Sequence, residues 1–441
     1  MSNSPFNRDI IDEKIKELRI VNTGKASIRE VVALVNLVEK ETGLKYVRME
    51  MGVPGLPPSE IGTNAEIEAL KKGVAAIYPM IDGIAPFKEE AARFVKNFLD
   101  IDVSPKVCVP TVGSMQGTYA AFMAAANAVL HKDTTLFIDP GFPVQKQQMM
   151  VLGQKYETFD VFHFRGEKLR VKLEEYFSKG NICSVVYSNP NNPSWICFTD
   201  EELQIIGETA AKYDIIVIED LAYFCMDFRQ DLSKPGEPPF QPTVAKYSDN
   251  YLLFISSSKI FSYAGQRCAL LVISDSLFRR DYPDLQKRFG GTDFGSTITL
   301  RLLYALSSGT CHSAQHAMTA MMKEANEGGY NFVKEVKEYG EKAKVMKKLF
   351  LENGFDIVYK NDIDKPVADG FYFTISYPGM TGNQLVENLL YYGISAIALD
   401  NTGSWEEGIR ICVSFVRRDQ FEDLERRLKL FNEHYSSGQS N

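Results

Sequence analysis

The chain has 441 residues, of which 45% are hydrophobic and 24% charged, and its formal net charge is −8. This length fits two or three domains, and the composition is typical of a globular protein with a large core. The negative charge, without a basic tract, argues against a nucleic acid or an anionic membrane as a partner. Seven dispersed cysteines without a CxxC motif, and a polar N-terminus without a signal-peptide pattern, predict a cytoplasmic protein.

The N-terminal region begins with residues 1–20, a polar stretch for which we expect an arm or a short helix. An amphipathic helix is predicted over Ser27–Lys40, because its apolar residues recur at helical spacing. Ser27 followed by Glu30 is the pattern of a capping box at its start. The segment Met49–Pro58 is rich in turn residues, so we expect it to cross between two domains beside a site.

From about residue 64 to 325, short apolar strands alternate with helices. The predicted strands are Val107–Pro110, Thr135–Asp139, Ser184–Ser188, Ile215–Glu219, Leu252–Ser256 and Cys268–Ser274. The predicted helices are Asn64–Ala76, Lys88–Leu99, Ser114–Leu130, Val144–Leu152, Asp200–Lys212 and Leu300–Glu327. This alternation predicts an α/β fold with a mainly parallel sheet that is buried on both faces.

The last hundred or so residues follow a different pattern. A charged helix is expected from Gly328-Gly329 to about Asn353, with Lys342–Lys348 as a solvated face. Strands are predicted at Phe355–Tyr359, Gly370–Ser376, Ile394–Ala398 and Ile409–Phe415, and a helix at Asp419–His434. We therefore predict an N-terminal arm and small-domain segment (1–60), a large domain (61–328) and a C-terminal small domain (329–441).

Polar motifs follow several of the predicted strands, where α/β folds bind ligands. Gly113–Gly117 opens a helix whose free N–H groups attract an anion, although a turn with Ser114 as the N-cap explains the same residues. Phe142, in Asp139–Pro143, could stack on a ring or belong to the core. The two Asn-Pro steps in Ser188–Pro193 predict a sharply defined loop, either for a ligand or simply as a turn.

Two carboxylates end the predicted strand Ile215–Glu219. Four β-branched residues run directly into Glu219 and Asp220, and a carboxylate at the end of a buried strand needs a partner. A cationic ring nitrogen, a metal ion or an arginine would each serve. Tyr223, three residues further on, can reach the same ligand through its hydroxyl.

The segment Ser256–Arg267 contains Lys259 among serines, with Arg267 eight residues later. A lysine amine forms a Schiff base with a carbonyl cofactor, while hydroxyls and a guanidinium bind a phosphate. A surface lysine is the alternative interpretation of this segment alone.

In their order and spacing, these motifs resemble those of the pyridoxal-phosphate-dependent aminotransferases of class I/II, the aspartate aminotransferase superfamily of fold type I. The resemblance runs from about Gly52 to Arg410. It implies a large domain that binds pyridoxal 5′-phosphate (PLP) on a mainly parallel seven-stranded sheet flanked by helices. It also implies a smaller α+β domain formed by the C-terminal part and the N-terminal segment, and a homodimer that moves amino groups between L-amino acids and 2-oxo acids.

The resemblance further implies a role for each matching residue. Lys259 would form the internal aldimine and move a proton during the transfer, and Asp220 would keep the ring nitrogen protonated. Asn192 and Tyr223 would contact the phenolic oxygen, while Phe142 would stack on the ring. The phosphate would be held by Ser114 and Met115 through backbone N–H groups, by Ser256, Ser258 and Arg267, and by Tyr78 of the neighbouring subunit, and the substrate by Gly52, Asn192 and the bidentate fork of Arg410.

The chain departs from the family pattern in three places. Ser194-Trp195 stands where Thr-Gly usually follows Asn-Pro, and Cys268 stands where a glycine commonly follows the phosphate-binding arginine. Tyr282–Ser308 looks like an inserted or reshaped region. It precedes Gly309–Ser313, where relatives place residues that enter the partner's site.

Other interpretations stay open at this point. The same fold and cofactor also support lyase or decarboxylase chemistry, and a catalytically silent ligand sensor is a third reading. His312 and His316 have the spacing of metal ligands on one helix face, although a polar helix start explains them and we expect no metal. Trp195 and Trp405 either line a substrate pocket or pack, and Arg301 is a candidate for binding a distal carboxylate.

Overall fold

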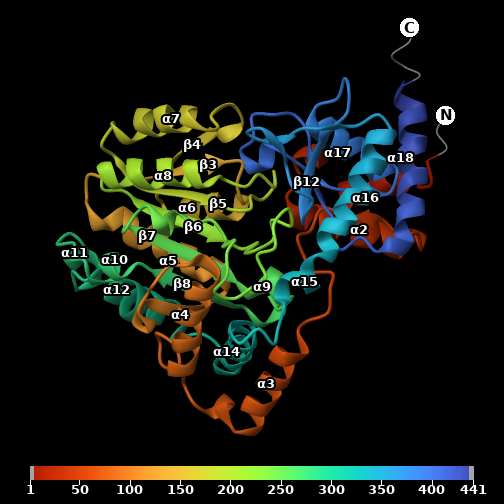
Figure 1. Ribbon diagram of the computed structural model, residues 1–441. Coiled ribbons are helices and arrows are strands. Elements are labelled where there is room, and N and C mark those ends of the chain that lie inside the picture. The colour runs from red at the N-terminus through yellow and green to blue at the C-terminus, as the bar shows by residue number, and fades with distance from the viewer. Residues whose placement is uncertain (1–3, 437–441) are drawn as a thin grey trace. The chain divides into compact units, whose positions relative to one another are not determined.

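The structure is a computed structural model that describes residues 4–436 (Figure 1). These residues form two compact units. The larger unit comprises Leu56–Asn191 and Cys197–Val336. The smaller unit comprises the chain up to Gly55, the short segment Asn192–Ile196, and the chain from Lys337 onwards.

The larger unit is built on a seven-stranded sheet. Its strands are β2 (Cys108–Val112), β3 (Thr134–Asp139), β4 (Lys155–Asp160), β5 (Ile182–Ser188), β6 (Ile216–Leu221), β7 (Tyr251–Ser256) and β8 (Cys268–Ile273). They lie in the order β2-β8-β7-β6-β5-β3-β4, and only β8 runs antiparallel to its neighbours. Every residue of β3 and of β5 to β8 is buried, because apolar strands suit a sheet covered on both faces. The predicted mainly parallel seven-stranded sheet is thus confirmed.

Helices flank this sheet (Figure 1). The helices of the larger unit are α3 (Glu60–Lys71), α4 (Ala85–Leu99), α5 (Gly113–Ala128), α6 (Pro143–Leu152), α7 (Glu167–Phe177), α8 (Asp200–Lys212), α9 (Ser257–Ile260), α10 (Asp275–Arg279), α11 (Leu285–Phe289), α12 (Phe294–Ser296), α13 (Tyr304–Ser307), α14 (His312–Asn326) and α15 (Phe332–Val336). The predicted single helix Leu300–Glu327 is wrong. A π-helical turn leads into α13, and the chain breaks at Ser308 and Gly309 before α14, because their φ angles of 57° and 117° do not fit a right-handed helix.

The smaller unit joins the two ends of the chain. Its elements are α1 (Arg8–Glu17), α2 (Ile28–Thr42), β1 (Val47–Arg48), α16 (Glu338–Glu352), β9 (Asp356–Ile357), β10 (Asn361–Asp362), β11 (Lys365–Pro366), β12 (Tyr372–Ser376), α17 (Gly382–Tyr391), β13 (Ile394–Ser395), β14 (Ile397–Ala398), β15 (Ile409–Cys412) and α18 (Phe421–Ser436). An antiparallel sheet has the order β14-β15-β12-β9, and β1 pairs with β13. The predicted capping box of Ser27 and Glu30 begins α2.

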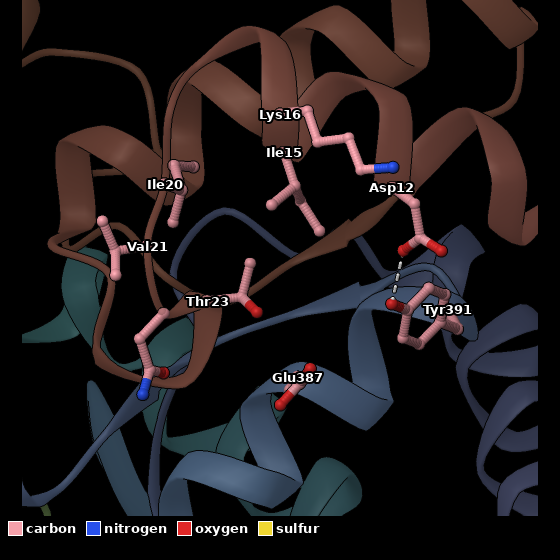
Figure 2. Close-up of a pocket in the computed structure, with 9 residues that line it drawn as sticks. Asp12, Ile15, Lys16, Ile20, Val21, Thr23, Glu387 and Tyr391 are labelled. Carbon is pink, nitrogen blue, oxygen red and sulfur yellow. Dashed lines mark hydrogen bonds between the residues drawn. The ribbon is translucent and has the colours of Figure 1, made fainter.

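The contact between the two ends of the chain is visible around Tyr391. Its hydroxyl donates to Asp12 of α1 at 2.7 Å, and both residues line a surface pocket with Ile15 and Glu387 (Figure 2). N-terminal helices therefore pack on α17, which follows them by most of the chain's length.

None of the helices within residues 4–436 combines the length and the apolar character that a membrane span requires.

Lys342 of α16 is buried, contrary to the predicted solvated face. Only 5% of the residue is exposed, and its Nζ donates to the carbonyl oxygens of Ser414 at 2.7 Å and Val416 at 2.6 Å. Burial lowers the pKa of Lys342 to about 8, because the charged amine is poorly solvated there. The neutral amine still has two N–H donors, so both hydrogen bonds survive deprotonation.

The lowered pKa of Lys342 predicts a pH-dependent stability. Between about pH 8 and pH 10.5 the unfolded chain keeps the proton that the folded chain has lost, so stability rises with pH in this window. Compared with Lys342→Met, the wild type is expected to gain about 1–2 kcal/mol of unfolding free energy between roughly pH 7.5 and 9.5. Urea titrations across this range measure the difference. The exposed neighbour Lys344→Met should give a flat difference, and a flat result for Lys342→Met would contradict the assignment.

Candidate active site

The carboxyl ends of β5, β6 and β7 lie side by side and carry most of the predicted residues. Ser188 pairs with Asp220 in the ladder of β5 and β6, and β7 follows as the next parallel strand. The last residue of β7, Ser256, caps α9, and Lys259 lies on this short helix. Parallel strands end at one edge of a sheet, so the fold brings these segments close together.

Asp220 is a buried carboxylate with neutral donors. It accepts a hydrogen bond at 3.0 Å from the side-chain amide of Gln145 and one at 3.1 Å from the backbone N–H of Ala222. Burial raises the pKa of Asp220 to about 6, although both donors oppose the shift. No ion pair among the described residues includes Asp220. A cationic ligand atom would suit this buried carboxylate.

Glu219, the neighbouring carboxylate, has a structural environment instead. Adjacent side chains of a strand point to opposite faces of the sheet. Glu219 accepts hydrogen bonds from the Thr243 hydroxyl at 2.6 Å and the Val244 N–H at 3.2 Å, and its burial raises its pKa to about 7. Of the two acidic residues that the sequence offered, Asp220 is the one that accepts a hydrogen bond from a side chain of α6.

Gln145 was missed by the sequence analysis. It lies on α6, which begins directly after Phe142, so one short segment carries both Phe142 and the donor to Asp220. The side-chain amide of Asn191 donates to the carbonyl of Pro140 at 2.8 Å, which joins this segment to the loop after β5. A glutamine in the first turn of a helix gives no pattern that would have identified it.

The N-terminus of α5 lies against Arg267. The N–H of Gly113 donates to the Arg267 carbonyl at 2.9 Å, and a Cβ atom added at Gly113 would overlap the guanidinium. The N-cap is Val112, so the interpretation of Ser114 as a capping residue is wrong. The Ser114 hydroxyl is instead buried without a hydrogen-bond partner among residues 4–436. Free N–H groups, a hydroxyl and a guanidinium together suit a phosphate; Met115 follows in the same turn.

The segment that carries Lys259 is fixed at several points. The Ser256 hydroxyl accepts from the Ser258 N–H at 3.2 Å, and the Ser257 hydroxyl donates to the Cys268 carbonyl at 2.6 Å. Lys259 and Ser258 are half-buried. These contacts hold the short helix against β8, so the lysine has a defined starting point.

Glu66 of α3 is a second residue that the sequence analysis missed. It accepts from the Tyr263 hydroxyl at 2.5 Å, within the segment of Lys259, and from the Ser313 hydroxyl at 2.9 Å at the start of α14. Three stretches of sequence that are far apart are thereby joined, and no motif connects them.

Arg410 in the smaller unit is almost fully buried, with 1% of the residue exposed. Its Nη1 donates to the Asn192 side chain at 3.2 Å and its Nη2 to the Glu50 carbonyl at 2.5 Å. The Nε atom is buried and has no hydrogen-bond partner within the part of the chain that the structure describes. A Cβ atom added at Gly52 would overlap the hydroxyl of Tyr372. A buried guanidinium with a spare donor suits a carboxylate ligand.

The remaining candidates divide into exposed and buried residues. Tyr78 is 88% exposed, Trp405 and Arg301 are also exposed, and Trp195 is fully buried, as its packing interpretation predicts. The rings of His312 and His316, which lie one helical turn apart, stack with their centroids 5.3 Å apart. Among residues 4–436 no three His, Cys, Asp or Glu side chains gather as metal ligands.

Comparison with known proteins adds a family and a fold. The sequence model of the family described as Aminotransferase class I and II matches residues 47–428. The aspartate aminotransferase of Sulfolobus acidocaldarius is 24% identical over 245 residues, which are 55% of this chain and 59% of that protein. The S-alkyl-thiohydroximate lyase of Arabidopsis thaliana is 27% identical over 162 residues, which are 36% of this chain and 34% of the relative.

The match covers only part of the length of the curated relatives, from 34% to 67%, whereas the structural match is almost complete. The aspartate aminotransferase from Thermus thermophilus, solved with maleate, superposes with a TM-score of 0.72. At 16% identity the match covers 96% of this chain and 98% of that one, so the two share a fold.

Proposed function

Because this chain belongs to the aminotransferase class I and II family, we propose that it is a PLP-dependent enzyme that moves an amino group between an L-amino acid and a 2-oxo acid. The observation that carries the proposal is the buried Asp220 carboxylate, whose hydrogen-bond donors within residues 4–436 are both neutral. The protonated ring nitrogen of the cofactor is a cation that fits this position. We also propose that the larger unit is the PLP-binding domain and the smaller unit the small domain.

The residues of the larger unit fit the cofactor at both of its ends. Ser114 offers a buried hydroxyl without a partner among residues 4–436, beside the free N–H groups of α5, and Arg267 adds a positive charge. Ser256 and Ser258 extend this group of donors. Because a phosphate needs several donors and charge neutralisation, these groups support a phosphate site.

The bound cofactor would supply an electron-withdrawing ring that takes up the electron pair released at the substrate Cα. Lys259 would hold the cofactor covalently through Nζ and would then carry the proton to and from Cα. Asp220 would keep the proton on the ring nitrogen, and Phe142 would stack on the ring. Tyr223 would donate a hydrogen bond from its hydroxyl group to the phenolic oxygen.

Residues of the smaller unit would bind the substrate. Arg410 would bind the α-carboxylate, which every amino acid and every 2-oxo acid in the exchange shares. Asn192 holds the guanidinium from the side, and Gly52 lies at the Tyr372 hydroxyl. The contact between Arg410 and Asn192 supports this proposal, because a guanidinium must be oriented before it can bind in a fork.

A donor screen tests the function. Each L-amino acid is incubated with 2-oxoglutarate and the PLP-loaded protein, and glutamate is measured. Formation of glutamate with at least one donor is the expected result. Release of ammonia and an oxo acid without an acceptor would instead identify a lyase, the second candidate, which the similarity to a plant lyase favours. Visible absorbance that does not change with any amino donor would contradict both.

We further propose that the enzyme is a homodimer with Tyr78 reaching the neighbouring site. Around Tyr78, exposed apolar side chains gather on the segment that carries Ile77 and Met80. The π-helical turn and α13 add further exposed apolar side chains. A Cβ atom added at Gly309, just after α13, would meet Pro79 and Ile81, so these segments lie close together. A contiguous exposed apolar face marks an interaction site, and a second copy would cover it.

Charge on this face is expected to separate the subunits. The double variant Ile77→Asp, Met80→Asp should run as a monomer in light scattering and should bind PLP at least about 10-fold more weakly, because both buried contacts and the Tyr78 contribution are lost. Val21→Asp, at a fully exposed valine of the smaller unit, is the control that should remain dimeric. A wild-type protein that is monomeric would contradict the assembly but not the amino transfer.

A further inference from the structure

Trp195 has an unusual backbone conformation for a large side chain. Its φ angle is 63°, in the left-handed region that glycine adopts freely and bulky residues avoid. Its indole ring is nevertheless buried, and 0% of the residue is exposed. Such a conformation persists only where the surroundings hold it, so the contacts of the ring must fix it.

Gly370 provides the space that the indole occupies. A Cβ atom added at Gly370 would overlap the Cε2, Nε1 and Cζ2 atoms of Trp195. The φ angle of Gly370 is not positive, so its backbone would accept any other residue. The tryptophan, and not the backbone, therefore requires a glycine at this position.

Tyr372 connects the indole to Arg410. The rings of Trp195 and Tyr372 meet edge to face, with centroids 6.2 Å apart and an interplanar angle of 67°. The guanidinium carbon of Arg410 lies 4.7 Å from the centroid of the same tyrosine ring, which is a cation–π contact. Because Tyr372 supports the guanidinium from one side and touches the indole on another, a shift of the indole moves the support.

The loop that contains Trp195 gives a second connection. Asn192, three residues earlier, accepts a hydrogen bond from the Nη1 of Arg410 at 3.2 Å. The whole segment Asn192–Ile196 belongs to the smaller unit, as do Gly370 and Arg410. Anchoring the indole therefore also fixes the end of the loop that orients the guanidinium.

We propose that Trp195 and Gly370 form a matched pair that positions Arg410 for the α-carboxylate of the substrate, an inference that rests on the proposed amino-transfer function. Trp195 is a positioning residue, which acts through Tyr372 and Asn192. The pair replaces a simpler solution, a glycine in the left-handed position, with a large ring that stiffens the carboxylate end of the site. Its effect is a preference for ligands with a carboxylate over otherwise identical neutral ligands.

The test uses 2-methylalanine and its primary amide as probes of the PLP-loaded protein. The acid has the α-carboxylate and two methyl groups on Cα. It has no hydrogen on Cα, so it binds without completing an amino transfer. The amide differs only in the charge that Arg410 would recognise. Isothermal titration gives both dissociation constants, and their ratio measures the contribution of the guanidinium.

Each single substitution is expected to weaken binding of the acid selectively. Gly370→Ala pushes the indole out of place, and Trp195→Gly removes it. Each should raise the dissociation constant of 2-methylalanine by about 10-fold and that of the amide by less than about 2-fold. In the double variant the added methyl group fits the space that the indole has left. The dissociation constant of 2-methylalanine should therefore rise by about 10-fold in the double variant. Independent effects would instead multiply to about 100-fold.

Controls and contrary outcomes are well defined. Gly329→Ala, where an added Cβ atom would meet only the flexible Glu324, should leave both constants unchanged. Equal losses for acid and amide, unchanged constants, or multiplied losses in the double variant would each overturn the positioning role. If Trp195→Gly fails to fold, Trp195→Phe with and without Gly370→Ala gives the same comparison with a smaller ring.

The titration also separates this inference from the proposed function, because it needs no turnover. If the protein transfers no amino group but its preference for the acid changes with the substitutions at Trp195 and Gly370, only the proposed function is contradicted. If the protein is an active aminotransferase but both substitutions leave its preference for the acid unchanged, only the positioning role is contradicted.

Discussion

Replacing Lys259 by alanine is expected to reduce amino transfer by at least about 10²–10⁴-fold, the range that a positioned acid–base group contributes, and further if covalent attachment matters to the rate. Alanine suits the helical position, and the Ser256 cap and the Ser257–Cys268 bond hold the backbone of α9 independently of the side chain. The loss should therefore be chemical. Single-turnover absorbance with the best donor of the screen measures it.

The same variant should still bind the cofactor, because the phosphate contacts are separate from Nζ. After denaturation and filtration, however, its cofactor should be released fully, whereas borohydride-treated wild type should retain it. Lys155→Ala, in the exposed ion pair of the edge strand β4 with Asp133, is the matched control with unchanged kinetics. A Lys259→Ala enzyme with wild-type turnover would show that another group carries the proton.

Exchanging Asp220 for asparagine is expected to lower kcat by about 10–10³-fold, because a nearby opposite charge changes the pKa of a titratable group by about one to three and so its protonation by the same factor. The amide keeps the shape and still accepts from Ala222, but it cannot hold a proton on the ring nitrogen by charge. Asp220→Glu retains the charge and should recover part of the loss. Glu219→Gln, one residue earlier, should change stability and leave kcat within about 3-fold.

The buried Asp220 carboxylate is also expected to lower the unfolding stability of the protein without cofactor, although the proposed activity requires it. Its folded pKa of about 6 lies above that of an aspartate in the unfolded chain, so the folded state loses stability as pH rises from about 4 to 6. Above that window the loss is complete. Without cofactor at pH 7.5, Asp220→Asn should therefore be more stable than the wild type by about 1–3 kcal/mol. Adding PLP should make the wild type the more stable of the two proteins. Thermal unfolding with and without PLP measures both stabilities. Equal stabilities without cofactor would contradict a buried charge at Asp220.

The sheet could be predicted because its strands are apolar throughout. Five strands whose residues are all buried, β3 and β5 to β8, begin and end within two residues of the predicted bounds. The edge strand β4 was missed, because its first residues are exposed and polar and therefore resemble a loop. The break at Ser308 was missed for a different reason. Apolar residues recur at helical spacing on both sides of it, so periodicity alone could not reveal a change of direction.

Candidate site residues could be predicted where they follow strands, because strand order fixes their neighbours. Asp220 and Lys259 are of this kind. Gln145, Glu66 and Tyr372 could not be found, because each enters through a contact between elements that are distant in sequence. The buried Lys342 was misjudged because the carbonyls that it meets lie in another segment, which a charge pattern does not show.

The division of the chain into three stretches for the smaller unit has a consequence for biosynthesis. The Tyr46 hydroxyl finds its partner, the Leu390 carbonyl, 344 residues further along the chain. The apolar cluster that includes Phe6, Leu34 and Leu390 is incomplete until then. On the ribosome the N-terminal helices must therefore wait, with their apolar faces uncovered, until nearly the whole chain has emerged. We expect early-terminated translation products to aggregate through these faces.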